Sequence, residues 1–490
     1  MPTTLEQELA EQSRWPFLKG ATDQKTYELL VRAEFVPPDA IRGAQDKMLR
    51  TVVTQSAAKA PYYAALFKRL GIDPADFRGA ADLPRLPILT RADLQEAGDD
   101  LMHAEAAAHK NDFVASQTSG STGTPVAVRR TFETWKLFAM LKQRELRWFR
   151  YDPAGTMAAI RAAVDLPPIN PGEPIKIGET ARLDRWPQIG YWFETGPFFG
   201  FGNRNPQEAQ ADWLREIDPE YLLMQSAELE QLALAFQDKP RPKNLKACQG
   251  VSQQMTAEMR NRIERILGVP VHENYGLNEV SLVASRCPEG GLFHIHAENC
   301  LVEIVDDDLR PCRPGDRGRI LVTSLSNGVM PLLRYDADDL AIAVDEPCPC
   351  GRTLPALTGL IGRYRRNALL PPETWSYWIM FQYSLMQMPD ELRRPLRQYQ
   401  LHQFRDNRFE LRVVAASPLA DAFKSHIYEY WQKGGEGEPP HLEIIEVDSI
   451  PRPRGGKFQN FTSDFAPVPK AEDLDSGPSP LAFTGPAENA

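Results

Sequence analysis

Basic residues, cysteines and long apolar runs are all scarce in this 490-residue chain, and each shortage excludes a class of protein. Its 56 lysines and arginines are outnumbered by 66 aspartates and glutamates, which gives a formal net charge of -10. A net-acidic chain binds nucleic acid and anionic membranes poorly, so we expect neither as a partner. Any phosphate must then be bound at a local site and not across a broad basic face.

No apolar run approaches the roughly 18 residues that a membrane-spanning helix needs, and the opening residues do not read as a secretory signal. We therefore expect a cytoplasmic protein. Six cysteines in such a chain indicate thiols or metal ligands in preference to disulfides. The 42% of hydrophobic and 25% of charged residues are ordinary for a globular protein and exclude a disordered chain or a collagen.

The pattern of apolar residues changes along the chain. Residues 1–110 carry periodic apolar residues with many Ala, Leu, Glu and Arg, which predicts mainly helix. Within this region, Pro84 and Pro87 exclude a helix, and Thr90 is placed to cap a helix that starts near Arg91. Between residues 111 and 362, short apolar runs alternate with helical segments, a pattern typical of α/β units and mixed sheets.

The predicted fold class is therefore α/β, with a large N-terminal domain of mixed sheets flanked by helices over residues 1–362. Residues 363–468 predict a small α+β C-terminal domain, whose final strand we place at 441–447. Residues 469–490 are rich in Pro, Gly, Ser and acidic residues, so a disordered tail is predicted there.

A loop rich in Ser, Thr and Gly follows a short apolar segment near residue 117. Because glycine lets the backbone approach a ligand closely, such a loop can aim N–H groups and hydroxyls at phosphate oxygens. It lacks the Gly-Lys-Ser/Thr ending of a Walker A loop, and the alternative is a polar hairpin turn. The candidate phosphate-binding residues are Thr118, Ser119, Gly120, Ser121, Thr122, Gly123 and Thr124.

Two later stretches supply an aromatic ring and carboxylates. In residues 273–280, Tyr275 could stack on a base and Glu279 could hold Mg²⁺ beside phosphates, although a strand end with a turn has the same pattern. In residues 332–341, Asp339 could accept hydrogen bonds from the vicinal hydroxyls of a ribose, and the alternative is an acidic β-turn.

Two stretches nearer the C-terminus supply cations. Gly362 and Arg363 lie at a change of composition, which suits a hinge with a cation facing phosphate or ribose, and the alternative is a solvated linker. Lys457 follows two glycines, in a loop that could deliver an ammonium to a distant site. The alternative for that loop is an ordinary basic tail.

The order and spacing of these five stretches resemble the adenylate-forming superfamily of acyl-CoA synthetases, carrier-domain adenylation modules and luciferases. Residues 60–73, 83–94 and 348–363 are most similar to its phenylacetate-CoA ligase and CapK-like branch. The resemblance implies an adenylate-forming enzyme fold with a mobile C-terminal domain. It also implies an AMP-forming ligase that uses ATP to convert a carboxylate into an acyl adenylate and pyrophosphate, and then forms a CoA thioester.

The resemblance leaves alternatives open. The acceptor could be an amine or a carrier-protein thiol in place of CoA, as in amide-forming and carrier-loading relatives. A hypothesis from another functional class is a nucleotide-binding or partner-docking protein that has this fold but catalyses no reaction. Phenylacetate-CoA ligases are often dimers, so the resemblance also implies a homodimer.

The resemblance assigns a role to each candidate residue. The Ser/Thr/Gly loop holds the β- and γ-phosphates, Tyr275 stacks on adenine, and Glu279 binds Mg²⁺. Asp339 and Arg363 bind the ribose, and Lys457 bridges the carboxylate and the α-phosphate before the small domain rotates about the hinge. Lys457 and Glu279 are thus the candidate catalytic residues. Matching positions around the nucleotide also include Gly250, Asn274, Gly276 and Asn278.

A metal site and an acyl pocket complete the predictions. Three cysteines and a histidine form a candidate tetrahedral zinc site, with His296 as an alternative to His294, and buried free cysteines are the alternative to a metal. The aromatic residues of 185–201 could line an aryl pocket or a core strand and loop, and we favour an aryl carboxylic acid. The candidate zinc ligands are Cys287, His294, Cys348 and Cys350.

Overall fold

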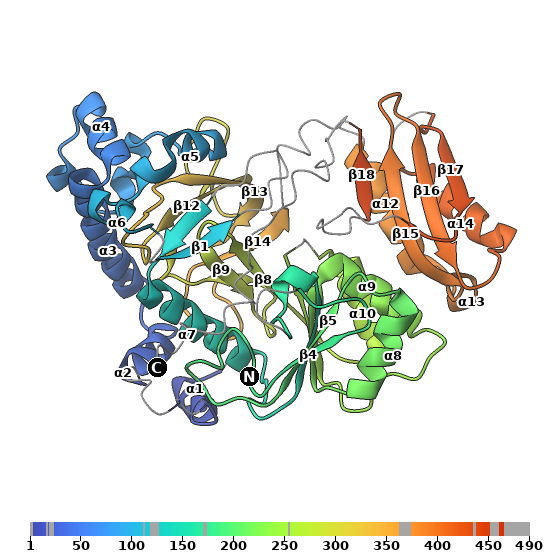
Figure 1. The fold of residues 1–490 in the computed structure, drawn as a ribbon. Coiled ribbons are helices and arrows are strands. Elements are labelled where there is room, and N and C mark those ends of the chain that lie inside the picture. The colour runs from blue at the N-terminus through green and yellow to red at the C-terminus, as the bar shows by residue number, and fades with distance from the viewer. Residues whose placement is uncertain are drawn as a thin grey trace.

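The computed structural model describes residues 3–15, 18, 24–110, 113–117, 127–169, 174–252, 255–361, 374–434, 438–450 and 460–464 (Figure 1). Its helices are α1 (Leu5–Gln12), α2 (Gln24–Ala33), α3 (Pro38–Lys59), α4 (Pro61–Leu70), α5 (Arg91–Ala97), α6 (Ala104–Ala107), α7 (Phe132–Trp148), α8 (Gln207–Ile217), α9 (Ser226–Ala235), α10 (Ala257–Leu267), α12 (Thr374–Gln387), α13 (Asp390–Arg393) and α14 (Asp421–Trp431). Short 3-10 helices are η1 (Pro74–Asp76), η2 (Ala80–Arg85), η3 (Gly98–Leu101) and η5 (Ala163–Asp165).

The strands are β1 (Val114–Gln117), β2 (Ala127–Arg130), β3 (Met157–Arg161), β4 (Thr180–Leu183), β5 (Phe198–Gly202), β6 (Tyr221–Gln225), β7 (Ala247–Val251), β8 (Val271–Leu277), β9 (Ser281–Arg286), β10 (Phe293–Ile295), β11 (Cys300–Val305), β12 (Arg317–Ser324), β13 (Tyr335–Ala343), β14 (Ala356–Ile361), β15 (Leu396–Gln403), β16 (Phe409–Ala415), β17 (Leu442–Glu446) and β18 (Phe461–Ser463). The fold is mixed α/β with a second, smaller sheet domain, as the sequence predicts.

Helices α1 to α6 occupy the N-terminal segment that the sequence predicts to be helical. Thr90 caps α5 as expected, because its side chain accepts the N–H of Asp93 while the Asp93 carboxylate accepts the N–H of Thr90. The prediction that the prolines exclude a helix is wrong for Pro84, which lies inside η2. The N–H groups of Asp82 and Leu86 still bond to carbonyls three residues back, so this short helix forgoes only the proline's own bond.

In the described part of the chain, the large domain is built on a twelve-stranded sheet with the order β11-β12-β13-β14-β10-β9-β8-β7-β6-β3-β5-β4. Strands β8, β7, β6, β3 and β5 run parallel, whereas the strands from β8 to β11 pair antiparallel. Strand β8 belongs to both halves: residues 271–273 pair with β7, and residues 274–277 pair with β9. The candidate residue Tyr275 therefore lies where the sheet changes character.

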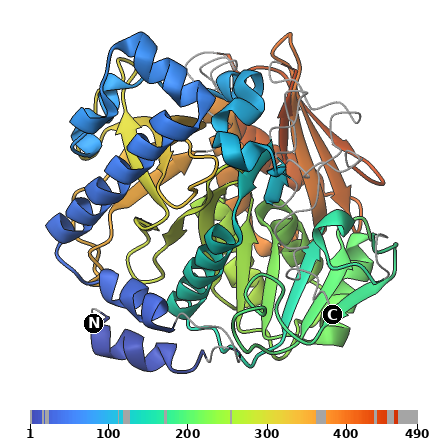
Figure 2. The same ribbon diagram turned by 60° about the vertical axis from the view of Figure 1, so that its left-hand side comes forward.

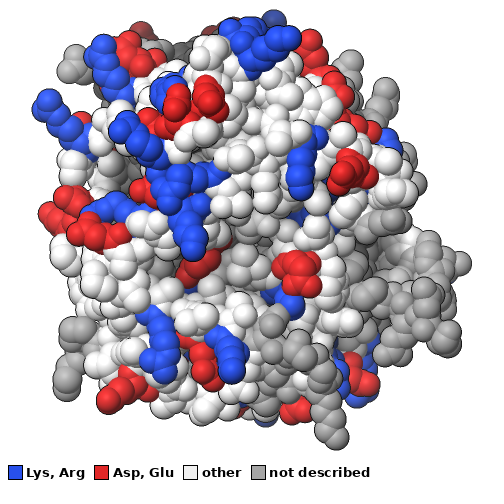
Figure 3. All heavy atoms as spheres, turned by 90° about the vertical axis from the view of Figure 1, so that its left-hand side faces the viewer, with Lys and Arg blue, Asp and Glu red and all other residues white. Residues whose placement is uncertain are grey.

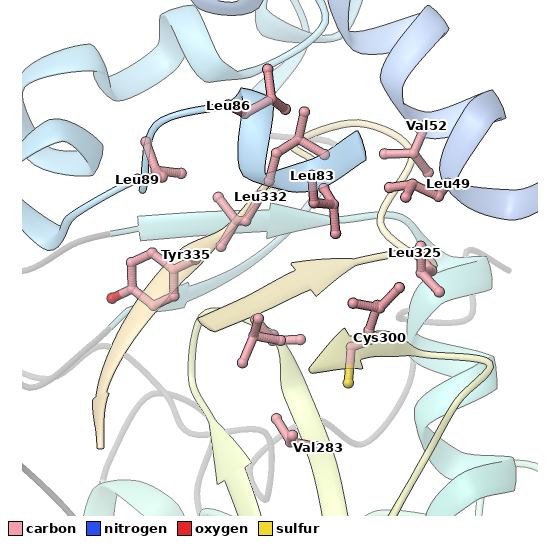
Figure 4. Close-up of a cluster of buried hydrophobic side chains, with 14 of the residues drawn as sticks. Leu49, Val52, Leu83, Leu86, Leu89, Val283, Cys300, Leu325, Leu332 and Tyr335 are labelled. Carbon is pink, nitrogen blue, oxygen red and sulfur yellow. The ribbon is translucent and has the colours of Figure 1, made fainter. Parts of the chain in front are cut away.

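Helices cover both faces of this sheet (Figures 1 and 2). Helices α8, α9 and α10 pack on the parallel half in one hydrophobic cluster, and α7 contributes to a second cluster on the same strands. The helices α3 to α5 pack on the antiparallel half around Leu49, Leu83, Leu332 and Tyr335 (Figure 4). These layers fix the strands whose ends carry the candidate site.

The small domain has a sheet with the order β17-β16-β15-β18, covered by α12 and α14. The strand predicted at 441–447 is β17, but it is not the final one, because β18 follows it and pairs parallel with β15. Strand β18 has only three residues, too few for an alternating pattern to be visible in the sequence. Helix α12, in an apolar stretch at 374–387, was also missed.

No helix among the described residues combines the length and apolar character needed to cross a membrane. On the face that Figure 3 displays, acidic and basic side chains lie interspersed and do not form a broad basic surface.

Candidate functional site

The predicted adenine and ribose residues meet at the seam of the large sheet. The Tyr275 hydroxyl on β8 donates a hydrogen bond of 2.7 Å to Asp339 Oδ2 on β13. Both side chains are buried, although 64 residues separate them in the sequence. Burial raises the pKa of Tyr275 well above its ordinary value, and Asp339 raises it further, so the phenol keeps its proton and remains a donor.

Glu279 lies two residues beyond β8 and is also buried. Its Oε1 accepts a 2.9 Å hydrogen bond from the Tyr335 hydroxyl and lies 3.2 Å from Nη1 of Arg91. Tyr335 is anchored in the hydrophobic cluster of the antiparallel half (Figure 4). Both bonds end on Oε1, and the carboxylate has a second oxygen, Oε2, with which to bind a cation. Oxygen ligands of this kind suit Mg²⁺.

Arg91, Arg130 and Tyr335 are site residues that the sequence reasoning missed. Arg130, on β2, donates to the backbone carbonyl of Asn278. Burial lowers the pKa of Arg130 to about 10, and Glu279 opposes that shift. Arg91 follows the helix cap Thr90 and Arg130 follows the Ser/Thr/Gly loop, so their places next to recognised motifs were the available signals.

Gly250 lies near the carboxyl end of β7, the parallel neighbour of β8. A Cβ there would come within 2.4 Å of the Met255 side chain and 2.9 Å of Ser226 Oγ, so a larger residue would force them apart. On β8, Asn274 Nδ2 donates a 3.2 Å hydrogen bond to Glu145 on α7. Ligands in open α/β sheets bind outside the carboxyl ends of the strands, which is where these residues gather.

A small apolar cavity of about 10 Å³ lies beside this seam, between α7 and the parallel strands. Its walls include Met157, Trp186, Phe198 and Leu223, and two of these belong to the aromatic stretch 185–201. Lys142 and Gln249 are its polar members. The Lys142 ammonium donates a 2.9 Å hydrogen bond to Gln249 Oε1 and pairs with Glu145, so its charge is balanced.

The predicted metal ligands gather at one point, with all four ligand atoms within 4.8 Å of one another. The sulfurs of Cys287 and Cys348 are 3.7 Å apart, close to the edge of about 3.8 Å of a tetrahedron with Zn–S bonds of about 2.3 Å. His294 Nε2 lies 3.2 Å from Cys350 Sγ, and its Nδ1 lies 3.4 Å from the Leu354 carbonyl. A protonated Nδ1 held by that carbonyl leaves Nε2 to bind a metal.

The alternative ligand His296 lies elsewhere. Its Nδ1 is 2.6 Å from an Arg144 nitrogen and its Nε2 is 2.9 Å from Ser285 Oγ. The geometry therefore selects His294. Near the ligands, a Cβ at Gly290 would lie 2.2 Å from Cys348 Sγ, so the turn requires glycine. The hydrogen bonds from Cys287 and His294 lower the pKa of Cys350 to about 3, which favours its thiolate.

A buried network of charges ties the N-terminal helices to the metal-ligand loop. Arg352, two residues after Cys350, lies 2.7 Å from Glu8 on α1 and 3.0 Å from Glu34 at the end of α2. Arg147 on α7 pairs with the same two carboxylates. All four of these side chains are buried, and the Thr3 N–H donates to the Cys350 carbonyl at 2.8 Å. The sequence reasoning missed this network because its members are scattered along the chain.

Several predicted site residues lie outside the described residues, so their places are not available for comparison: the loop Thr118–Thr124, Gly362, Arg363 and Lys457. The roles of all the predicted residues remain proposals, including those that the structure brings together. Among these, the structure joins Tyr275 to Asp339, places Asn278 and Glu279 beside Arg130 and Arg91, and gathers the metal-ligand set.

No protein-family model matches the chain. The chain is 28% identical over 352 residues to a phenylacetate-coenzyme A ligase of Thermus thermophilus, covering 67% of this chain and 72% of that protein. A phenylacetate-coenzyme A ligase of Aromatoleum evansii is 25% identical over 328 residues, covering 66% of this chain and 70% of that protein.

A solved 2-hydroxyisobutyryl-CoA ligase, in its postadenylation state with 2-HIB-AMP, has a TM-score of 0.68 with this chain at 19% identity, covering 88% of this chain and 91% of that one. The same ligase in its thioesterification state with 2-HIB-AMP and CoA has a TM-score of 0.56 at 18% identity, covering 89% and 92%. The fold of this chain is therefore more similar to the first state. In sequence the chain is therefore similar to phenylacetate-coenzyme A ligases, and its fold is similar to that of the 2-hydroxyisobutyryl-CoA ligase.

Proposed function

We propose that this protein is an AMP-forming acid–thiol ligase, which activates a carboxylic acid with ATP and transfers the acyl group to CoA. The observation that carries the proposal is the contact between Tyr275 and Asp339 at the seam of the sheet, with Glu279 close by in the sequence. In this proposal the Tyr275 ring stacks on the base, Asp339 accepts hydrogen bonds from the ribose, and Glu279 holds the metal.

The chemistry has two steps. First, a carboxylate oxygen attacks the α-phosphorus of ATP, and the bond to pyrophosphate breaks. Then the CoA sulfur attacks the acyl carbonyl, loses its proton, and AMP leaves with the electron pair of the broken C–O bond. Both steps gather negative charge on phosphate oxygens, so preorganised cations and donors lower the barrier.

The described residues have distinct tasks in this scheme. Asp339, oriented by the Tyr275 hydroxyl, accepts hydrogen bonds from the ribose hydroxyls. Glu279 would hold Mg²⁺, which neutralises phosphate charge when bound. Arg91 and Tyr335 fix the Glu279 carboxylate, and Arg130 fixes the turn that carries it. For Lys457, Arg363 and the loop Thr118–Thr124, the proposed roles rest on the family resemblance.

For the acid, we propose a compact aryl carboxylate bound in the pocket beside α7. Trp186 and Phe198 would supply aromatic walls, and these side chains would have to move apart to admit the acid, since the cavity between them measures only about 10 Å³. The Lys142–Glu145 pair and Gln249 provide a polar boundary next to Gly250. Replacement of Trp186 by alanine should favour larger acids, since it widens the pocket.

For the metal centre, we propose a structural zinc ion held by Cys287, His294, Cys348 and Cys350. Three sulfurs and one nitrogen would complete a tetrahedral set, and structural zinc sites leave no position open for substrate. The ion would hold in place the loop that leads into β14 and to the hinge region beyond it.

A homodimer is a further proposal that rests on the family resemblance, and light scattering would test it. We also propose a cytoplasmic location, which would supply ATP and CoA.

Pyrophosphate exchange over a panel of aryl and alkyl acids tests the first step, and product analysis with CoA or amines identifies the acceptor. We expect Asp339→Asn to reduce exchange by about 10²-fold, since an amide is a weaker acceptor for two ribose hydroxyls. Asp308→Asn, in an exposed turn between β11 and β12, is the matched control. Equal exchange in all three proteins would contradict the assignment.

A further inference from the structure

Glu230 on α9 is a fully buried carboxylate, with 0% of its surface exposed, at the place where the small domain rests on the large one. One of its oxygens pairs with Arg262 on α10, inside the large domain. The other accepts hydrogen bonds of 2.6 Å from the Tyr399 hydroxyl and 2.9 Å from Asn460 Nδ2, both in the small domain. A single carboxylate thus joins the two domains.

Neighbouring contacts surround this point. Gln231, next on α9, bonds to Gln398 at 2.9 Å and to Asn460 Oδ1 at 3.2 Å. Leu234 on α9 belongs to the hydrophobic cluster of the small domain, and Ile266 on α10 packs against it. At the more exposed edge, Asp238 pairs with Arg397. In Figure 1, β15 and α12 lie directly over α9 and α10.

The distribution of charge makes this interface separable. Glu230 is neutralised by Arg262 from its own domain, while the small domain contributes only neutral donors at that carboxylate. If the small domain leaves, the ion pair stays intact and water can replace the two donors. A charged partner from the small domain would instead have to be separated from its counter-ion, at a larger cost.

The interface also fixes the chain next to Lys457. Asn460 follows Lys457 by three residues, and its side chain is held by Glu230. Its backbone carbonyl accepts the N–H of Leu401 on β15 at 2.8 Å. The end of the segment that carries Lys457 is therefore tied both to the small sheet and to α9 of the large domain.

We infer that Glu230, with Tyr399 and Asn460, is an interdomain latch that holds the small domain in the arrangement for adenylate formation and must open for the second step. The inference rests on the proposed function and deepens it. Glu230 is a positioning residue, since its contacts are with Arg262, Tyr399 and Asn460. A weakened latch should therefore slow the first half-reaction selectively.

The test compares Tyr399→Phe, which removes one hydroxyl, with Tyr428→Phe. The Tyr428 hydroxyl bonds only weakly, at 3.3 Å, to Leu442 within the small domain, so this variant is the matched control. We expect Tyr399→Phe to reduce pyrophosphate exchange about tenfold, because the hydroxyl donates to the charged Glu230 carboxylate and also accepts from Asn460 Nδ2 at 3.1 Å. Thioester formation from preloaded acyl adenylate should be unchanged or faster, and the control should change neither.

Small-angle X-ray scattering supplies a readout that does not depend on activity. The variants Tyr399→Phe and Glu230→Gln should enlarge the radius of gyration of the full chain, whereas Tyr428→Phe should not. An equal loss in both half-reactions, or a scattering curve like that of the wild type, would overturn the latch. If none of the acids in the panel supports pyrophosphate exchange by the wild type, the proposed function fails. The scattering result alone still decides for or against the latch.

Discussion

Two buried charge networks in this molecule are built in opposite ways. In the first, Arg147 and Arg352 meet Glu8 and Glu34, so opposite charges come from segments far apart in the chain. In the second, Glu230 and its counter-ion Arg262 both belong to the large domain, and the small domain adds only neutral donors to Glu230. The first network suits permanent attachment, because separating its members would leave buried charges without a counter-ion. The second suits a contact that opens and closes.

The strongest test of this contrast is the removal of a charge from the permanent network. Arg352→Met leaves Glu34 paired with Arg147 alone and Glu8 with Arg147 and the half-exposed Arg150, so we expect the free energy of unfolding to fall by about 3–5 kcal/mol. Denaturant titration measures it. The control Arg14→Met breaks the half-exposed pair with Glu11 and should cost below about 1 kcal/mol. Similar losses for the two variants would remove the contrast.

The metal-ligand loop carries Arg352, so removal of the metal should also weaken the contacts of Arg352 with Glu8 and Glu34. We expect about one zinc per chain by elemental analysis and a lower melting temperature after chelation, since metal binding to a folded site adds to stability. Cys348→Ser should lower the zinc content and the melting temperature together. Cys312→Ser, at a cysteine outside the ligand set, is the control. A chelator-treated protein with an unchanged melting temperature would argue against a structural metal.

The smallest effect should come from the edge of the separable interface. The Asp238 side chain is 38% exposed and pairs with Arg397 and Arg394, so water and salt screen it. We expect Asp238→Asn to change the free energy of unfolding by less than about 1 kcal/mol and pyrophosphate exchange by less than about threefold. An effect as large as that of Tyr399→Phe would indicate that Asp238, and not Glu230, holds the small domain in place.

Local signals in the sequence predicted much of the fold. The alternation of apolar runs with helical segments indicated the mixed α/β architecture, and Thr90 marked the start of α5. The predictions that failed concern elements that are short or that depend on their tertiary surroundings. Strand β18 has three residues, and η2 accepts Pro84 because a brief 3-10 helix needs few N–H donors. Secondary-structure patterns carry little information at that length.

The same distinction between local motifs and tertiary context applies to the candidate site. Residues inside recognisable motifs, such as Tyr275, Asp339 and Cys348, could be proposed from the sequence, and the structure joins the first two through a hydrogen bond. Residues that act by tertiary contact, such as Arg91 and Glu230, have no motif of their own. Arg91 lies 188 residues from Glu279, and Glu230 lies 169 residues from Tyr399 and 230 from Asn460, so only the folded chain reveals these contacts.

Strand β8 has a practical consequence for anyone who wishes to dissect this protein. It supplies its first residues to the parallel half of the sheet and its last to the antiparallel half. A cut before β8 would leave β7 as an unpaired sheet edge, whereas a cut after β8 would separate Tyr275 from its partner Asp339. The large domain should therefore resist division into working pieces, and truncations are best confined to the region beyond β14.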